Sequence, residues 1–430
     1  MRLNLKPHHL PLAQKLVDKA HANGGLAPLD LERFWEDNAL ARRDPFARDC
    51  PQVPLGIGMA PDCFFAELGI DENAETLHKL HREPEWSRPL TKQYNDRAEE
   101  IVGRRLLSEA GPADPTRQYP PVKALHDIFE AVNEWHTDSW WLKQAAHNVD
   151  ELRALLDRVE ARLDNLRAFL LPPNWDEERQ RLMALGVKPG LYRGQRGPVT
   201  LAASIYGPEN LLFLFYDSPD LVARFRDLIL RAMLDLGTIL DEEAGYTAEA
   251  APRGFSFCDD NCCLLSPDMY ELFGYPILKG LFDRYAPDPG NTRGQHSDSA
   301  MGHLLPLLGR LNLSWTNFGP TVMVDQIRQH LPNAVIHGQL APFTFSRNDE
   351  VGLVAEFLRD FDMAREKRGL LFATAGSINN GSRLTGLRLI MAAIQEYGRY
   401  ERLSTDDSEP AAAARSGLSL DDTLRPMTQA

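Results

Sequence analysis

The sequence predicts an α/β protein that folds as a (β/α)8 TIM-type barrel with an N-terminal helical extension. From Arg196 onward, short apolar runs alternate with longer helical stretches. This alternation is typical of parallel β/α units. Six clear units, with two weaker ones before Arg196, give the eight that close a barrel. An open doubly wound sheet is the main alternative, but no glycine-rich phosphate-binding fingerprint follows any predicted strand.

The predicted strands are short apolar runs. The first covers residues 53–59, and the second covers residues 136–144, where Trp140 and Trp141 leave a helix packed on the barrel as the alternative. The later strands are residues 198–206, 254–259, 292–296, 311–317, 334–339 and 370–374. The helices that follow them have apolar residues at helical spacing and cover residues 219–243, 267–285, 300–308, 322–331, 349–365 and 384–397.

Three segments differ in character along the chain. Residues 1–50 carry short helical patterns and are expected to pack on the barrel, which residues 51–403 form as the catalytic domain. Residues 404–430 contain acids, an alanine run and no aromatic residue. Such a segment cannot bury enough apolar surface to offset its chain entropy, so we expect a flexible acidic tail.

The composition disfavours several classes of protein. Apolar residues make up 43% and charged residues 25% of the chain, as in globular domains. A net charge of −14 disfavours binding to nucleic acid or to an anionic membrane. The most apolar run, residues 211–216, is far shorter than the roughly 20 residues that span a bilayer. The N-terminus has no apolar signal core, and five cysteines do not form a disulfide framework, so a cytoplasmic location is expected.

Polar side chains follow the predicted strands at their C-terminal ends. In a (β/α)8 barrel these positions face the substrate. We expect the rim to bind a small molecule, without a nucleotide cofactor, through Arg196, Tyr206, Asn317, His337, Gln339, Ser377 and Asn379.

The sharpest local feature is His296 and Asp298. Two residues apart on a strand, they project from the same face, so the imidazole and the carboxylate can converge on one metal ion or one proton. We therefore predict both as catalytic residues and as metal ligands. In the alternative, Asp298 caps a helix that begins at Ala300.

Asp259 and Asp260 follow the next strand upstream and are predicted to be catalytic as well. Paired acids can provide a general base or bind a metal ion. The alternative is a hydrogen-bonded turn before the helix that starts at Pro267. The neighbouring thiols of Cys258, Cys262 and Cys263 are either soft metal ligands or, as is commoner, buried free cysteines.

Several motifs, in a fixed order, resemble the uroporphyrinogen decarboxylase superfamily, which includes decarboxylases and methyltransferases that serve corrinoid proteins and thiols. The motifs are Gly197-Pro198-Val199-Thr200-Leu201-Ala202 with Gly207 and Glu209, Leu265-Ser266-Pro267 with Tyr270, Phe273 and Pro276, His296, and Gly338-Gln339-Leu340-Ala341-Pro342. The resemblance implies the barrel fold and an enzyme of one-carbon chemistry.

The chain also departs from both branches of that superfamily. The decarboxylases have an Arg-Gln-Ala-Gly-Arg motif after the first strand, where this chain has Met59-Ala60-Pro61-Asp62, and a Gly-His-Gly stretch where it has Ala375-Gly376-Ser377. The zinc methyltransferases use two cysteines, and this chain has Asp298 and Gly376 at those places. A harder site that includes His296 and Asp298 could bind zinc, iron or manganese.

The resemblance therefore leaves three functions open. The first is methyl transfer on a small substrate at a metal-assisted site, with a corrinoid or a corrinoid protein as partner. The second is decarboxylation of a tetrapyrrole-like or other carboxylate, for which Arg193, Arg196 and Arg293 are the cationic candidates. The third is a non-catalytic barrel that binds a corrinoid or tetrapyrrole. A homodimer is the oligomer considered.

Overall fold

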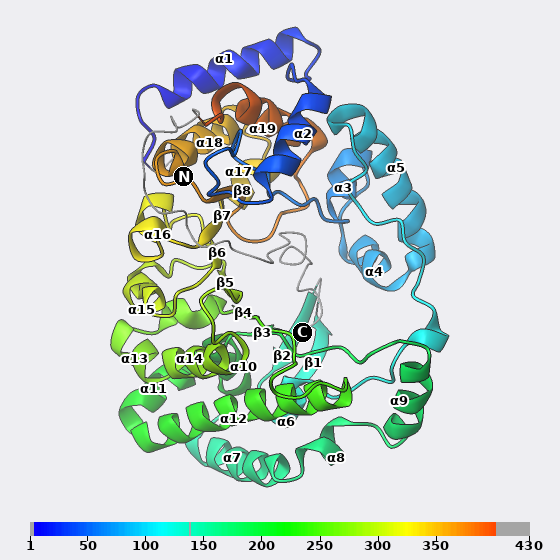
Figure 1. Cartoon of the computed structure of the whole chain (residues 1–430), viewed down its shortest axis with the longest axis vertical. Coiled ribbons are helices and arrows are strands. Elements are labelled where there is room, and N and C mark those ends of the chain that lie inside the picture. Colours follow the sequence, from blue (N-terminus) through cyan, green and yellow to red (C-terminus); the bar gives the residue numbers. More distant parts are fainter. Residues whose placement is uncertain (1–3, 137–138, 401–430) are drawn as a thin grey trace. The chain divides into compact units, whose positions relative to one another are not determined.

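Parallel strands followed by helices form the framework of the protein, as a computed structural model of the chain shows for residues 4–136 and 139–400 (Figure 1). The described residues divide into two compact units. Unit 1 contains residues 4–110, 300–302 and 314–400, and unit 2 contains residues 111–299 and 303–313. The predicted tail, residues 404–430, lies outside the described residues.

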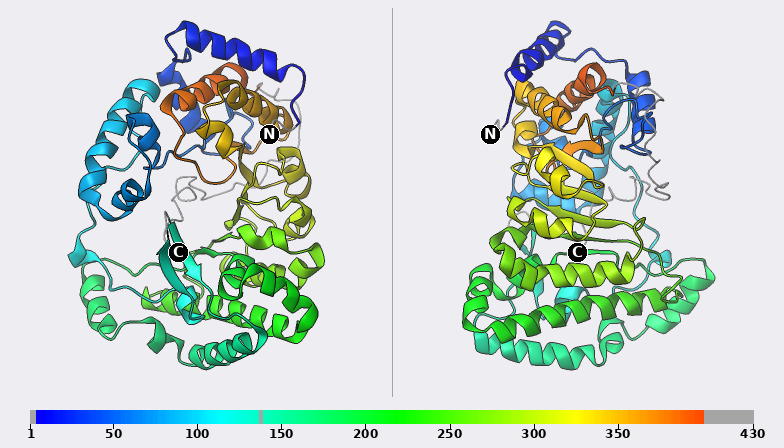
Figure 2. Two further views of the ribbon diagram at one scale, coloured as in Figure 1. Left: turned by 180° about the vertical axis from the view of Figure 1, so that it is seen from behind. Right: turned by 60° about the vertical axis from the view of Figure 1, so that its left-hand side comes forward.

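Unit 2 is built around the parallel strands β3 (Gly194–Arg196), β4 (Phe255–Cys258) and β5 (Arg293–Ser297), which pair in that order. Its helices are α6 (Leu125–Ile128), α7 (Val149–Leu163), α8 (Leu166–Leu170), α9 (Trp175–Ala184), α10 (Pro198–Tyr206), α11 (Pro208–Asp217), α12 (Pro219–Glu243), α13 (Pro267–Leu272), α14 (Gly274–Tyr285) and α15 (Leu305–Gly309), with 3-10 turns η1 (Pro115–Arg117) and η2 (Asp260–Leu264). The long helix α12 packs against α7 and α14 (Figure 2).

Unit 1 contains the parallel strands β6 (Trp315–Phe318), β7 (Val335–Leu340) and β8 (Leu370–Thr374), in that order. Leu55, in the first predicted strand, pairs in parallel with Phe372 of β8. The helices are α1 (His9–Ala22), α2 (Leu31–Ala41), α3 (Cys63–Leu68), α4 (Ala74–Arg82), α5 (Pro84–Val102), α16 (Val324–His330), α17 (Pro342–Ser346), α18 (Glu350–Ala364) and α19 (Leu384–Tyr397). The 3-10 turn η3 (Gly302–Leu304) begins at the last residue of the segment 300–302 and otherwise belongs to unit 2. Helix α1 packs on α18 and α19 (Figure 1).

One predicted strand is a helix. Residues 198–206 form α10, and the strand of this repeat is β3, just before it. Pro198 stands at the first helical position, where its missing N–H costs nothing. Nearly every residue of α10 is buried, and a short apolar run that is buried on all sides has the same pattern in a strand and in a helix.

The second predicted strand is one member of an antiparallel pair. Residues 132–136 form β1 (Val132–His136) and residues 139–143 form β2 (Ser139–Lys143), and Trp135 lies opposite Trp140. Trp140 and Trp141 are exposed. Of the predicted helices, residues 267–285 divide at Phe273 into α13 and α14, and residues 300–308 form η3 and then α15. No helix within the described ranges is long and apolar enough to cross a bilayer.

Candidate active site at the ends of β3, β4 and β5

The C-terminal ends of three neighbouring strands bring one row of side chains together. Arg196 on β3 is in register with Cys258 on β4, which is in register with His296 on β5. Registered neighbours in a sheet project to the same face, and all three side chains are half-buried. The residues one position earlier, Phe257 and Gln295, project to the opposite face and are fully buried. The row is therefore on the more accessible face of the sheet.

Asp260, His296 and Asp298 form a cluster at the end of this row. Nε2 of His296 lies 3.1 Å from Oδ1 of Asp298 and 3.9 Å from Oδ1 of Asp260. The backbone N–H of Asp298 donates a hydrogen bond of 2.8 Å to Oδ1 of Asp260. The His296 side chain is 20% exposed, and the two carboxylates are 45% and 44% exposed. The three groups thus converge at a place that a ligand can reach.

Asp298 does not cap a helix. The residues after it form no helix until η3 at Gly302, and its carboxylate pairs with His296 instead. The structure therefore favours the predicted partnership of His296 and Asp298 over the capping alternative.

Asp259 has a different environment from Asp260. It is completely buried, and Oδ1 accepts a 2.8 Å hydrogen bond from the N–H of Thr200, in the first turn of α10. The hydroxyl of Thr200 accepts the N–H of Asn261 at 3.0 Å. Burial raises the pKa of Asp259 to about 7, and the bond from Thr200 opposes that rise. Asp259 thus caps α10 from another segment and does not join the cluster predicted for it.

Gly197 makes this capping possible. A Cβ at position 197 would lie 2.2 Å from Cβ of Asp259, so no larger side chain fits there without displacement. Together Gly197, Thr200 and Asp259 fix the loop that presents Asp260 beside His296. The motif that begins at Gly197 therefore positions the site, a role that the sequence analysis did not assign to it.

The thiols near the cluster are not poised as ligands. Burial raises the pKa of Cys258 to about 12, and burial also raises the pKa of Cys262, whose Sγ lies 3.7 Å from Oγ of Ser297. No cysteine belongs to a group of candidate metal ligands within the described residues.

Residues 191–397 match the family model "Uroporphyrinogen decarboxylase (URO-D)". The resemblance to the uroporphyrinogen decarboxylase-like superfamily is confirmed. Because the fold of that superfamily is a TIM-type barrel, the match and the six parallel strands also confirm the predicted fold class. The chain is similar to the solved structure of a methyltransferase from Methanosarcina mazei, with 15% identity, a TM-score of 0.48, and coverage of 84% of this chain and 98% of that chain. No curated protein gave a significant match to the sequence.

Several predicted substrate-binding residues have structural partners within the protein. Tyr206 is buried inside α10 rather than placed at the end of a strand. The side-chain amide of Asn317 donates to the carbonyls of His337 and Thr374. Gln339 is fully buried, and Nε2 donates to the carbonyls of Phe318, Gly319 and Val322. These amides join strands and loops of unit 1, and substrate binding by them stays a prediction.

The other predicted rim residues of unit 1 differ in accessibility. His337 is 3% exposed and stacks on Trp315, and burial lowers its pKa to about 3. Ser377 is exposed and Asn379 is half-buried. All of them lie in unit 1, whereas the Asp260–His296–Asp298 cluster is in unit 2.

His126 is a residue of this region that the sequence did not reveal. It is half-buried, and burial lowers the pKa of its imidazole; the charge of Asp127 opposes this shift and the nearby charge of Arg196 adds to it. Its segment precedes the hairpin and carries no motif, so no local pattern in the sequence links it to Arg196.

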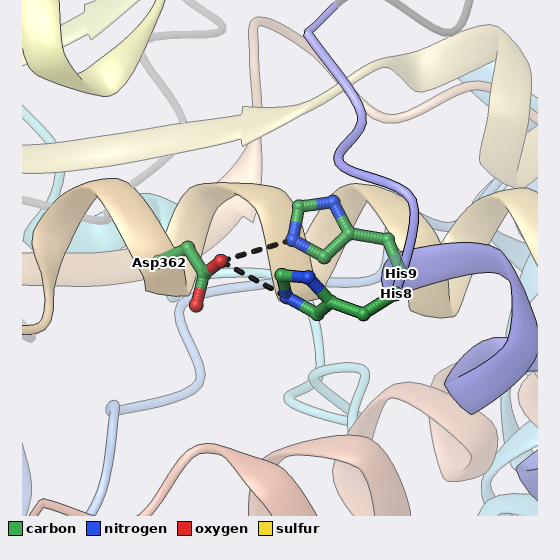
Figure 3. A group of neighbouring side chains, drawn as sticks. All are labelled: His8, His9 and Asp362. Carbon is green, nitrogen blue, oxygen red and sulfur yellow. Dashed lines mark hydrogen bonds and ion pairs between the residues drawn. The ribbon is translucent and has the colours of Figure 1, made fainter.

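A second group of possible metal ligands joins the N-terminus to α18. Nε2 of His9 and Nε2 of His8 lie 3.1 Å and 3.2 Å from Oδ2 of Asp362 (Figure 3). The Lys6 ammonium also lies 2.9 Å from that oxygen. The backbone N–H of Lys6 donates to Nδ1 of His9, so the proton of a neutral His9 is on Nε2, which then donates to Asp362. A protonated Nε2 and an adjacent ammonium do not suit the binding of a metal cation. The group instead holds the N-terminal end of α1 against α18.

Proposed function

We propose that this member of the uroporphyrinogen decarboxylase-like superfamily is an enzyme that transfers a methyl group to or from a small substrate, assisted by one divalent metal ion. The observation that carries the proposal is the convergence of Asp260, His296 and Asp298 at the ends of β4 and β5. One imidazole nitrogen and two carboxylate oxygens suit zinc, iron or manganese better than a soft, thiolate-seeking ion. His296 also stands where the resemblance implies a zinc ligand in the methyltransferases.

The residues of the chain have separate tasks in this proposal. His296 and Asp298 would hold the ion with Asp260, and the ion would supply a Lewis acid that lowers the pKa of a substrate thiol or hydroxyl. Asp259 and Thr200 hold the loop of Asp260, so that its carboxylate stays beside His296. A corrinoid or a corrinoid protein is the proposed methyl donor or acceptor.

A second candidate is decarboxylation of a carboxylate substrate, because one of the three arginines named for it is suitably placed. Arg193 is paired with Asp241 at 2.6 Å, and Arg293 donates to the carbonyls of Ala286 and Leu311. Arg196 stands at the C-terminal end of β3 in the row with His296. In this function His296 and Asp298 would move a proton without needing a metal ion.

Metal content and methyl transfer, measured on the same preparation, test the proposal. We expect about one zinc, iron or manganese ion per chain by elemental analysis, and demethylation of methylcobalamin by a small thiol, followed by visible absorbance. His296→Ala should lose both the ion and the activity, whereas His147→Ala, at an exposed histidine of unit 2, should keep both. Metal-free protein that releases CO2 from a carboxylate favours decarboxylation. Tight corrinoid binding that survives His296→Ala, without turnover, would show a binding protein instead.

A further inference from the structure

We propose that Arg196 binds a carboxylate group of the substrate, so that the substrate is a small monocarboxylate held between Arg196 and His296. The inference rests on the proposed function, because it takes the Asp260–His296–Asp298 cluster as the reacting end of the site. It adds the substrate class and the residue that recognises it.

The guanidinium of Arg196 has unused donors. Its one hydrogen bond among the described residues goes from a terminal nitrogen to Oγ of Ser204, at 3.2 Å. Within that part of the chain no carboxylate lies within ion-pair distance of it, although Asp260 is near enough to affect its pKa. A guanidinium carries five N–H donors, and Arg196 is half-buried, so most of its donors are left for a ligand. An anion suits these donors best, because it pairs with the positive charge as well.

The row of side chains limits the size of the substrate. Arg196 and His296 are registered to the same residue, Cys258, and their strands are separated by β4. Neighbouring strands are about 4.8 Å apart, so the two Cα atoms are roughly 10 Å apart, and both side chains project to the same face. A molecule of a few carbon atoms can therefore reach from Arg196 to His296. A tetrapyrrole is much larger than this separation.

The charges around Arg196 favour a carboxylate over a phosphate. Asp260 and Asp298 bring two negative charges to the same region, which a divalent ion would balance, so Arg196 supplies the positive charge left for a ligand. Burial and Arg196 lower the pKa of His126, against the opposing effect of Asp127, and so disfavour a second positive charge there. One guanidinium can neutralise one charge, and its planar fork matches a planar carboxylate through two parallel hydrogen bonds.

Binding of simple probes tests this assignment without knowledge of the natural substrate. Propionate, propionamide, ethanesulfonate and inorganic phosphate are titrated into the full-length protein, with ligand-detected NMR as the measurement. We expect propionate to bind with a millimolar dissociation constant and propionamide to bind at least about tenfold more weakly, since a charge-assisted hydrogen bond is lost. Arg196→Met should weaken propionate binding by a similar factor, and Arg196→Lys should weaken it less because the charge remains.

The controls separate this inference from the proposed function. Arg153→Met removes an exposed arginine of unit 2 and should leave propionate binding unchanged. Zinc binding should persist in Arg196→Met and disappear in His296→Ala. Equal binding of propionate to wild type and Arg196→Met overturns the inference even if zinc is bound, and preference for ethanesulfonate or phosphate over propionate overturns the substrate class. Absence of zinc together with Arg196-dependent propionate binding counts against the metal and supports the carboxylate site. If Arg196→Met does not fold, equal binding of propionate and propionamide to wild type still refutes the proposal.

Discussion

Nε2 of His296 lies 3.1 Å from Oδ1 of Asp298, and this pair is the centre of the candidate site. His296 lies in β5 and Asp298 directly follows Ser297, the last residue of that strand, and side chains two positions apart share a face in extended chain. The contact places an acid–base or ligand pair at the C-terminal end of β5. The first prediction follows from it.

His296→Ala and Asp298→Ala should each lower turnover by about 10²–10⁴-fold while the fold is kept, because both groups act at the reacting atoms. The double variant should be little worse than the worse single variant, since groups that act as a unit are not additive. Turnover and thermal melting are measured on the same three proteins. Full activity in His296→Ala, or a loss of activity explained by unfolding, would remove this pair from the mechanism.

Gly197→Ala should destabilise the protein by about 1–3 kcal/mol, the usual cost of overpacking a buried place. The added methyl group would meet Cβ of Asp259 at 2.2 Å, in the contact that holds Asp259 over the first turn of α10. Urea denaturation gives the change in free energy of unfolding. Gly190→Ala is the matched control, because a Cβ at position 190 meets nothing within 4 Å. Equal stability of the two variants would contradict the proposed contact.

Acid should destabilise unit 1 through His337. Burial lowers the folded pKa of His337 to about 3, below its ordinary value of 6.5, so the unfolded chain binds the proton more readily. Its contribution to stability is fully present above pH 6.5 and is lost progressively as the pH falls from 6.5 toward 3. His337→Gln, which cannot titrate, should show a shallower loss of stability between pH 7 and pH 5. Parallel stability curves for the two proteins would show that His337 is accessible to protons in the fold.

Asp362→Asn should loosen α1 from α18. Burial raises the pKa of Asp362, but the hydrogen bonds from Lys6 and His9 outweigh burial and lower it, so the carboxylate is favoured in the folded protein. The variant loses this charge-assisted contact, at a cost of about 1–2 kcal/mol to the docking of the helix. Backbone hydrogen exchange should rise across residues 9–22.

Glu396→Gln provides the matched control for Asp362→Asn. Glu396 of α19 pairs with Lys19 of α1 through partly exposed side chains, at 2.8 Å. Exposed ion pairs contribute little, so exchange across α1 should change less than in Asp362→Asn. Equal hydrogen exchange across α1 in the two variants would show that the His8–His9–Asp362 group does not hold α1 against α18.

The local pattern of apolar residues was sufficient to predict most strands and helices of the β/α repeat. Strand β8 and helices α12 and α19 have the predicted bounds, and β4, β5 and β7 differ from theirs by one residue at each end. These segments combine a clear apolar period with a proline or a polar boundary, so local propensity and tertiary structure agree. The pairing of His296 with Asp298 also followed from spacing alone, because both residues are on one strand end.

The tertiary structure decided the long-range contacts, which the apolar period of a sequence segment cannot specify. Residues 198–206 form a helix whose first turn is capped by Asp259, from a distant segment, and this contact also separates the role of Asp259 from that of Asp260. Gln339 and Asn317 look like rim residues in the sequence, yet the carbonyls of other strands and loops use their amides. Hydrogen bonds between residues far apart in the chain determine which polar side chains are left for a ligand. The sequence by itself determined the α/β repeat and the His296–Asp298 pair, and the structure determined which other polar groups could belong to the site.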